Sequence, residues 1–349
     1  MTAAVSGAVS TDDPTVVADV GGTRVVDTRA LPWRGTDAPT PRVLSRTLAR
    51  DAEGDAVVDE RWMTAWSPTS TTHGYRLVHE YYLCLAGEFT HNERDPETGR
   101  DTPVVFRPGT WMDRSPGSLT SGALAVPQSV RGIGWLTRGP DPYVGLAEAA
   151  SLTTTLDGSP VAPDTAHEAA GEQAGVVLAN GYTTVLDSHA MPWAPSAGLP
   201  GARERVLSRR LDGDAGVVLL GIPAGPAPWG GGDGWRGHHD FREFWLVLEG
   251  ELTVRLHDGP GDRTGVPVTL GEGHWLDRPP GAVWGVDPGE ATPTGATILS
   301  VRLRRDTVLP KERDKHAVWT RTVDGGPRSI APRSSVEELL AFRRGGATP

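Results

Sequence analysis

The stretch Arg242–Leu252, REFWLVLEGEL, decides the fold because an earlier stretch of the chain repeats its pattern. That earlier stretch is His79–Phe89, HEYYLCLAGEF, and each of the two has a Glu and a Gly separated by six residues. Further along, GHWLDRPPGA at Gly273–Ala282 repeats GTWMDRSPGS at Gly109–Ser118. Similar blocks that recur in one order at a fixed offset indicate a tandem duplication.

Two more pairs of blocks support the duplication and place its boundary. They are VVDTRALPW at Val25–Trp33 with VLDSHAMPW at Val185–Trp193, and RVLSR starting at Arg42 and at Arg205. The offset is about 160 residues, which indicates one repeat per domain. A polar segment rich in Ala, Gly and Pro separates the copies and is typical of a linker. We therefore expect an N-terminal barrel at 1–150, a linker at 151–175, a C-terminal barrel at 176–325, and a helix and tail at 326–349.

The apolar runs in both copies predict an all-β fold. They are short, rich in β-branched and aromatic residues, and interrupted by Gly, Pro and Asp, a pattern that favours antiparallel strands over helices. One short helix is expected near the C-terminus. There Ser334 and Ser335 precede Glu337 and Glu338 by three residues, which is a capping-box pattern.

The composition excludes several classes of partner. The net charge of −10 and the lack of a Lys/Arg cluster argue against nucleic acid and anionic membranes. No apolar stretch approaches the roughly 20 residues that cross a bilayer, and the N-terminus lacks the features of a secretory signal, so we expect a cytoplasmic protein. The single cysteine, Cys84, rules out an internal disulfide. The 12 tryptophans favour a small-molecule partner, because rigid rings line apolar pockets.

The repeated Glu, Gly and Pro-Gly pattern resembles the two conserved stretches of the cupin superfamily. It consists of Glu80, Gly87, Gly109 and Gly117 in the first copy and of Glu243, Gly250, Gly273 and Gly281 in the second. The resemblance covers most of both copies and implies a bicupin, with two tandem jelly-roll barrels. It also implies a homodimer, since cupins often cover their open strand edges by pairing.

The resemblance further implies a divalent metal, which the family holds with two His and a Glu from the first stretch and a His from the second. This sequence departs from that pattern, because Trp284 stands at the last His position and only one of His238 and His239 falls on the first pair. A bulge that turned both histidines inward would make His238, His239 and Glu243 a metal site. Two alternatives for the cofactor therefore stay open: one ion of Fe, Mn, Ni or Zn in the C-terminal barrel, or no metal.

Without metal, the second barrel has the residues for proton transfer. Strand parity places Trp245 on the face of Glu243, and apolar surroundings would raise the pKa of that carboxyl towards neutrality. Glu243, His239 and His238 are thus the candidate catalytic residues. The alternative for Glu243 is a buried ion pair with a nearby arginine. The candidate substrate-binding residues are Trp245, Trp284, Trp275, Trp235, Arg242 and Asp277.

These features together predict an enzyme of specialised metabolism that acts on a small organic molecule. Its chemistry would be acid–base, of the isomerase, lyase or cyclase type, or metal-assisted oxygenation. A non-catalytic ligand-binding or sensory bicupin is the alternative. Because Tyr75, Arg76 and Glu80 replace His238, His239 and Glu243 in the first copy, we expect activity in the C-terminal barrel and a structural role for the N-terminal one.

Overall fold

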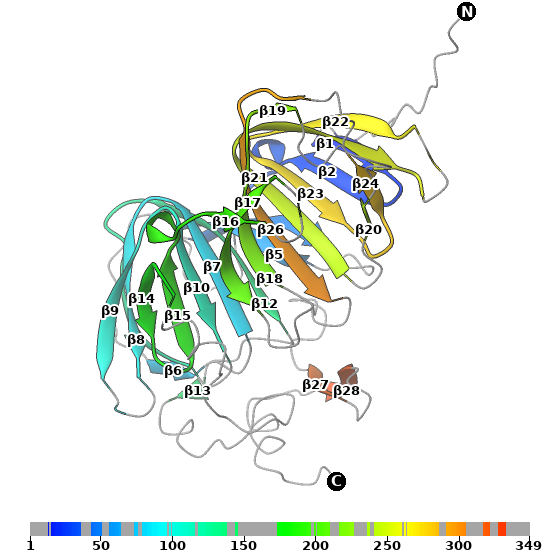
Figure 1. Cartoon of the computed structure of the whole chain (residues 1–349). Helices are drawn as coiled ribbons and strands as arrows, with labels where there is room; N and C mark the ends of the chain where they lie inside the picture. The colour runs from blue at the N-terminus through cyan, green and yellow to red at the C-terminus, as the bar shows by residue number, and fades with distance from the viewer. Residues whose placement is uncertain are drawn as a thin grey trace, which may run out of the picture. The chain divides into compact units, whose positions relative to one another are not determined.

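The computed structural model confirms an all-β chain (Figure 1). The structure describes residues 13, 15–35, 43–50, 56–63, 73–75, 79–95, 98, 100–115, 118–137, 144–145, 173–196, 199, 201–209, 216–226, 236–237, 241–259, 262, 264–285, 291–304, 317–321 and 327–332. The only helical segments in these ranges are two single turns, Thr28–Ala30 and Ser188–Ala190. Neither turn is long enough to cross a membrane. The expected C-terminal helix and most of the linker lie outside the described residues.

The chain divides into two compact units, and the first combines residues 1–31 with residues 192–305. We call it the β21 unit. Its strands are β1 (Val16–Val20), β2 (Thr23–Asp27), β16 (Ala194–Pro195), β17 (Arg203–Arg209), β18 (Gly216–Ile222), β19 (Gly225–Pro226), β20 (Arg236–Gly237), β21 (Phe241–His257), β22 (Val266–Gly271), β23 (His274–Arg278), β24 (Val283–Gly285), β25 (Ala291–Thr292) and β26 (Ala296–Arg304). The main sheet has the order β1-β2-β23-β21-β26-β18-β17-β16, and β22 and β24 pair with the second half of β21.

The second compact unit combines residues 32–191 with residues 306–349, and we call it the β7 unit. Its strands are β3 (Arg34–Gly35), β4 (Val43–Arg50), β5 (Ala56–Met63), β6 (His73–Tyr75), β7 (His79–Ala86), β8 (Phe89–Arg94), β9 (Asp101–Phe106), β10 (Thr110–Arg114), β11 (Leu119–Ala125), β12 (Val130–Thr137), β13 (Val144–Gly145), β14 (Val176–Ala179), β15 (Thr183–Asp187), β27 (Ala317–Arg321) and β28 (Pro327–Pro332). One sheet has the order β14-β15-β10-β7-β12-β5-β4-β3, a second has the order β13-β6-β11-β8-β9, and β27 pairs with β28.

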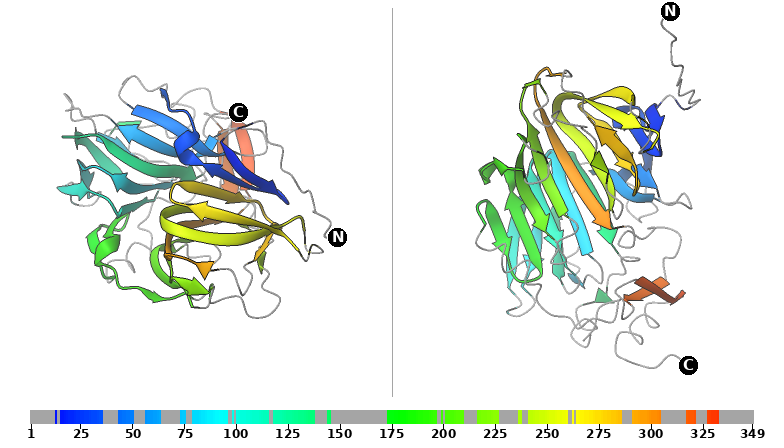
Figure 2. Two further views of the ribbon diagram at one scale, coloured as in Figure 1. Left: turned by 90° about the horizontal axis from the view of Figure 1, so that it is seen from above. Right: turned by 45° about the vertical axis from the view of Figure 1, so that its right-hand side comes forward.

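The hairpin that begins each repeat belongs to the barrel of the other repeat. Strand β2 pairs with β23, so that Val25 lies opposite Leu276, and β15 pairs with β10, so that Val185 lies opposite Met112 (Figures 1 and 2). The compact units therefore differ from the contiguous division at 1–150 and 176–325. Strand pairing, rather than the order of the blocks along the chain, determines which residues share a core.

A repeated glycine allows the chain to pass from one sheet of each barrel to the other. Gly87, between β7 and β8, and Gly250, within β21, both have a φ of 77°. A Cβ at either position would collide with a carbonyl oxygen, that of Ser129 or of Gly295. Only glycine combines this backbone conformation with so close an approach.

Each barrel has an apolar core to which both of its layers contribute. In the β21 unit the core includes Val25, Trp245, Val247, Val254, Leu256, Leu270, Leu276, Trp284 and Ile298. In the β7 unit it includes Tyr82, Cys84, Phe89, Val104, Phe106, Met112, Val126, Val130 and Val185. The rings of Phe89 and Phe106 stack at 4.6 Å. Cys84 is buried as its apolar context predicts, and burial raises the pKa of its thiol to about 12.

Because each hairpin packs in the barrel of the other repeat, a substitution in one hairpin should destabilise that other barrel. Val25→Asp places a carboxylate in the core of the β21 unit, where burial of a valine contributes about 1.5–3 kcal/mol. Hydrogen exchange of the full chain should then show lost amide protection in β21 and β23 and retained protection in β7 and β10. Val185→Asp, at the matching repeat position, should have the opposite effect. Loss of protection in β7 and β10 on Val25→Asp would contradict the exchange.

Candidate functional site

Glu243 is the centre of a buried cluster in the β21 unit. Its Oε2 accepts a hydrogen bond from Arg278 Nη2 at 2.6 Å, and its Oε1 accepts one from Arg302 Nε at 3.1 Å. Oε1 also accepts from Trp245 Nε1 at 3.0 Å and from Ser300 Oγ at 3.4 Å. The alternative of a buried ion pair with a nearby arginine therefore describes Glu243, with Arg278 as its main partner. Such strong hydrogen bonding to the charged form favours an ionised carboxylate.

Two tryptophan rings enclose the guanidinium of Arg278. Its central carbon lies 4.3 Å from the ring of Trp245 and 4.3 Å from that of Trp284, and the two rings meet edge to face at 4.9 Å. Burial lowers the pKa of Arg278 to about 10, an effect that Glu243 offsets in part. The side chain thus remains a cation at neutral pH, held by ring faces that attract positive charge.

The residues described around Glu243 do not fit the divalent metal that the cupin resemblance implies. The guanidinium of Arg278 is hydrogen-bonded to the Glu243 carboxylate oxygen that would otherwise ligate a cation. Trp284, at the last His position, has no ligating atom. In the β7 unit, Arg114 binds Glu80 in the same way, with Nη1 2.7 Å from Oε2. No group of three or more His, Cys, Asp or Glu side chains suited to a metal occurs in the part of the chain that the structure describes.

The structure divides the expected substrate-binding residues between the two faces of one sheet. Trp245 and Trp284 share the inner face with Glu243 and are buried in the core. Trp275 stacks on Phe244, which strand parity places on the opposite face of β21. Two more of the expected residues lie on that opposite face: Arg242 donates from Nε to Asp277 Oδ1 at 2.8 Å, and burial raises the pKa of the Asp277 carboxyl. Trp235, His238 and His239 lie outside the described residues.

A second cluster, which sequence reasoning missed, lies inside the β7 unit. It consists of Glu80 on β7, His91 and Glu93 on β8, and Arg114 on β10. Arg114 binds both carboxylates: its Nη1 donates to Glu80, its Nε donates to Glu93 Oε2 at 3.1 Å, and its Nη2 donates to Glu93 Oε1. One guanidinium therefore connects two glutamates from neighbouring strands.

His91 lies between a hydrogen-bond acceptor and a donor. Its Nδ1 is 2.9 Å from Glu93 Oε1 and 3.1 Å from Arg114 Nη2. With a proton, Nδ1 donates to the carboxylate; without one, it accepts from the guanidinium. Burial would raise the pKa of Glu93, but Arg114 and His91 outweigh it and lower that pKa to about 2. The imidazole thus has a partner at Nδ1 in either tautomer.

The two clusters differ in their access to solvent. The side chains of Glu243 and Arg278 are 2% and 3% exposed, whereas those of Glu80 and His91 are 12% and 16% exposed. The imidazole of His91 is therefore partly exposed, while the Glu243 carboxylate is enclosed. Sequence reasoning could have used two signals. One is the alternation in FTHNER, which puts His91 and Glu93 on the face of Phe89, and the other is the Asp-Arg pair repeated in both copies.

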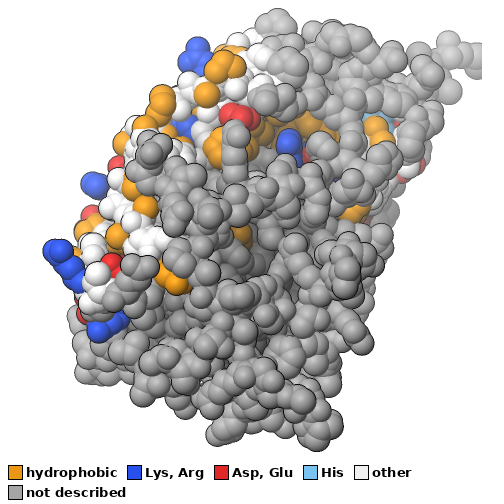
Figure 3. Space-filling model, turned by 60° about the horizontal axis from the view of Figure 1, so that its bottom comes forward, with side chains coloured by type: hydrophobic (Ala, Val, Ile, Leu, Met, Phe, Trp, Pro, Cys, Tyr) orange, Lys and Arg blue, Asp and Glu red, His pale blue; other side chains and the backbone are white. Residues whose placement is uncertain are grey.

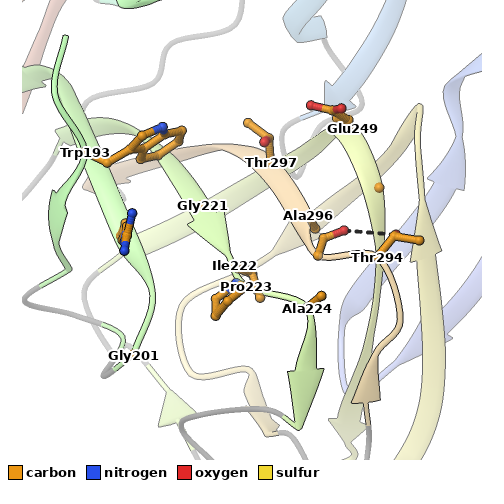
Figure 4. Close-up of a pocket in the computed structure, with 13 residues that line it drawn as sticks. Trp193, Gly201, Gly221, Ile222, Pro223, Ala224, Glu249, Thr294, Ala296 and Thr297 are labelled. Carbon is orange, nitrogen blue, oxygen red and sulfur yellow. Dashed lines mark hydrogen bonds between the residues drawn. The ribbon is translucent and has the colours of Figure 1, made fainter.

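A separate hollow of about 660 Å³ lies in the β21 unit (Figure 4). Trp193 stands at one side, and Thr294 and Glu249 stand at the other. None of its lining residues belongs to the Glu243 cluster. In the coloured part of Figure 3, acidic and basic side chains are interspersed with apolar ones.

Comparison with solved structures shows which class of fold this is. A candidate dioxygenase from Nostoc punctiforme matches with a TM-score of 0.51 at 13% identity, over 89% of this chain and 87% of its own. The Streptomyces albus protein HEPD, solved with 2-hydroxyethylphosphonate and Fe(II), matches with a TM-score of 0.50 at 12% identity, over 82% and 77%. No protein-family model and no curated protein sequence matches the chain. The chain has a bicupin fold, as its sequence predicted, and shares that fold with both of these proteins.

The lowered pKa of Glu93 makes stability depend on pH in a defined direction. Because the pKa falls from 4.5 to about 2 on folding, the ionised group stabilises the fold above about pH 4.5. That contribution is lost as the pH falls towards about 2. Thermal unfolding should therefore show Glu93→Gln less stable than the wild type at neutral pH, with the difference shrinking as the pH falls. Glu88→Gln, at an exposed neighbouring position, is the control and should change little at any pH. A difference for Glu93→Gln that grows in acid would contradict the ion pair.

Proposed function

We propose that this bicupin is an enzyme that moves a proton on a small organic molecule, with His91 in the β7 barrel as the acid–base residue. The observation that carries the proposal is the position of Nδ1 between Glu93 and Arg114. A general base must gain and lose a proton in each turnover without losing its orientation. His91 meets this requirement, since Nδ1–H can donate to Glu93 Oε1 both before and after the other ring nitrogen takes up a proton.

The remaining ring nitrogen, Nε2, is the atom that would touch the substrate. Among the described residues it has no hydrogen-bond partner, and the ring is partly exposed. Nε2 would take a proton from a carbon next to a carbonyl group and return it to the same or a neighbouring atom. Such a step is redox-neutral and gives an isomerisation or epimerisation. Glu93 and Arg114 are then positioning residues, because they act through the imidazole.

The choice of barrel differs from the expectation drawn from the sequence. Placing activity at Glu243 stays a prediction, but its carboxylate is bound by two arginines, a tryptophan and a serine. A general base needs a lone pair that the substrate can reach. The hydrogen bonds to Glu243 already use the lone pairs of its carboxylate. Oxygenase chemistry would need a metal, and the described residues around Glu243 and Glu80 do not fit one. The expected homodimer and cytoplasmic location also stay predictions, and light scattering tests the first.

Solvent deuterium exchange tests the proposed chemistry without knowledge of the natural substrate. The full chain would be incubated in D₂O with a panel of small aldehydes, ketones and 2-oxo acids, and deuterium incorporation measured by mass spectrometry. At least one compound should exchange faster with the protein than without it. His91→Gln should lower that rate by about 100-fold, the usual scale for a general base. His189→Gln, an exposed histidine of the same unit, is the matched control and should not change it.

Glu93→Gln separates catalysis from structure in the same assay. It keeps the shape of the side chain but replaces the carboxylate that accepts from Nδ1 with a neutral amide, so the imidazole is held less firmly and the exchange rate should fall while the chain stays folded. The proposal fails if His91→Gln leaves exchange unchanged. It also fails if Glu243→Gln, shown to be folded by circular dichroism, lowers the rate as much as His91→Gln does; activity would then lie in the β21 barrel.

A further inference from the structure

The core of the β21 unit contains hydrogen-bond donors that no described residue satisfies. Of the guanidinium nitrogens of Arg278, Nη2 donates to Glu243, whereas Nε and Nη1 have no partner among the described residues. The indole Nε1 of Trp284, whose ring lies against the same guanidinium, also has none. Arg278 and Trp284 are each 2% exposed. Buried donors without partners are rare, because leaving them unpaired costs free energy, and they point to an acceptor that fills the gap.

The charges of the cluster indicate the sign of that acceptor. Glu243 contributes one negative charge, and its two partners, Arg278 and Arg302, contribute one positive charge each. The three side chains therefore carry an excess of one positive charge, mostly out of contact with water. The matching cluster of the β7 unit has the opposite balance, since Arg114 faces both Glu80 and Glu93. A single anion would balance the charges of these three side chains.

We propose that the β21 barrel binds a small monovalent carboxylate against Arg278 and Trp284. A guanidinium nitrogen and an indole N–H supply the donors that carboxylate oxygens accept, and arginine matches this group better than a spherical ion. The rings of Trp245 and Trp284 lie against the same guanidinium and keep it away from water. Arg302, which is 30% exposed while it binds Glu243, connects the cluster to the surface.

This site is distinct from the proposed acid–base site, because it lies in the other unit and needs neither His91 nor Glu93. It also assigns a role to Trp284, which stands at the last His position of the cupin pattern. A neutral molecule of the same shape would leave the positive charge unbalanced and should bind far more weakly.

Titration of the full chain with sodium formate and sodium acetate, followed by calorimetry at constant ionic strength, tests the proposal. Acetamide, which has the shape of acetate without its charge, and sodium chloride are the comparison ligands. Acetate or formate should bind saturably below about 100 mM, and acetamide and chloride should not. Trp284→Phe keeps an aromatic ring but removes the N–H, and should weaken carboxylate binding by about tenfold. Arg278→Lys should weaken it further, because lysine lacks the planar fork.

The control variant is Trp275→Phe. Trp275 is another buried tryptophan whose Nε1 lacks a partner among the described residues, but it lies on the opposite face of β23. Its replacement should leave carboxylate binding unchanged. The proposal is overturned if neither carboxylate binds, if acetamide or chloride binds as well as acetate does, or if Trp284→Phe and Trp275→Phe have equal effects. Should Arg278→Lys not fold, the comparison of the two tryptophan variants decides.

Discussion

The buried pair of a glutamate and an arginine, present once in each barrel, is the interaction on which the rest of the structure depends. Glu80 faces Arg114 across β7 and β10, and Glu243 faces Arg278 across β21 and β23. Removing one partner of such a pair costs about 3–5 kcal/mol, because the other charge is left buried and uncompensated. The two strands of each barrel must therefore stay in register, and each cluster must accommodate a cation where the cupin resemblance places a metal.

The surroundings of the pair explain how two similar barrels came to differ. In the β7 unit, His91 and Glu93 extend the pair into a chain of hydrogen bonds that reaches solvent. At the matching positions of the β21 unit, Val254 and Leu256 belong to the apolar core. The cluster in one barrel thus has an excess of carboxylates and a partly exposed imidazole, while the cluster in the other has an excess of guanidinium groups, of which that of Arg278 is enclosed by aromatic rings. The first arrangement suits proton transfer, and the second suits binding of an anion.

Much of the fold could be predicted from the sequence, but the way in which the barrels are assembled could not. The repeated blocks and their alternating apolar residues identify the strands, and parity correctly puts Trp245 with Glu243. The exchange of hairpins such as β1–β2 depends on tertiary pairing, which the similarity between copies does not specify, since either hairpin has the pattern to fit either barrel. The same limit applies to His91, whose partner Arg114 is distant in sequence and meets it only after β8 and β10 share a barrel.

The most direct test of the central claim is anomalous X-ray diffraction from crystals of the full chain grown with Mn(II). If the arginines take the place of a metal, the electron density will show Arg114 against Glu80 and Arg278 against Glu243. No anomalous peak will then lie within coordination distance of either carboxylate. An anomalous peak ligated by Glu80 or Glu243, with the guanidinium group displaced from it, would contradict the claim.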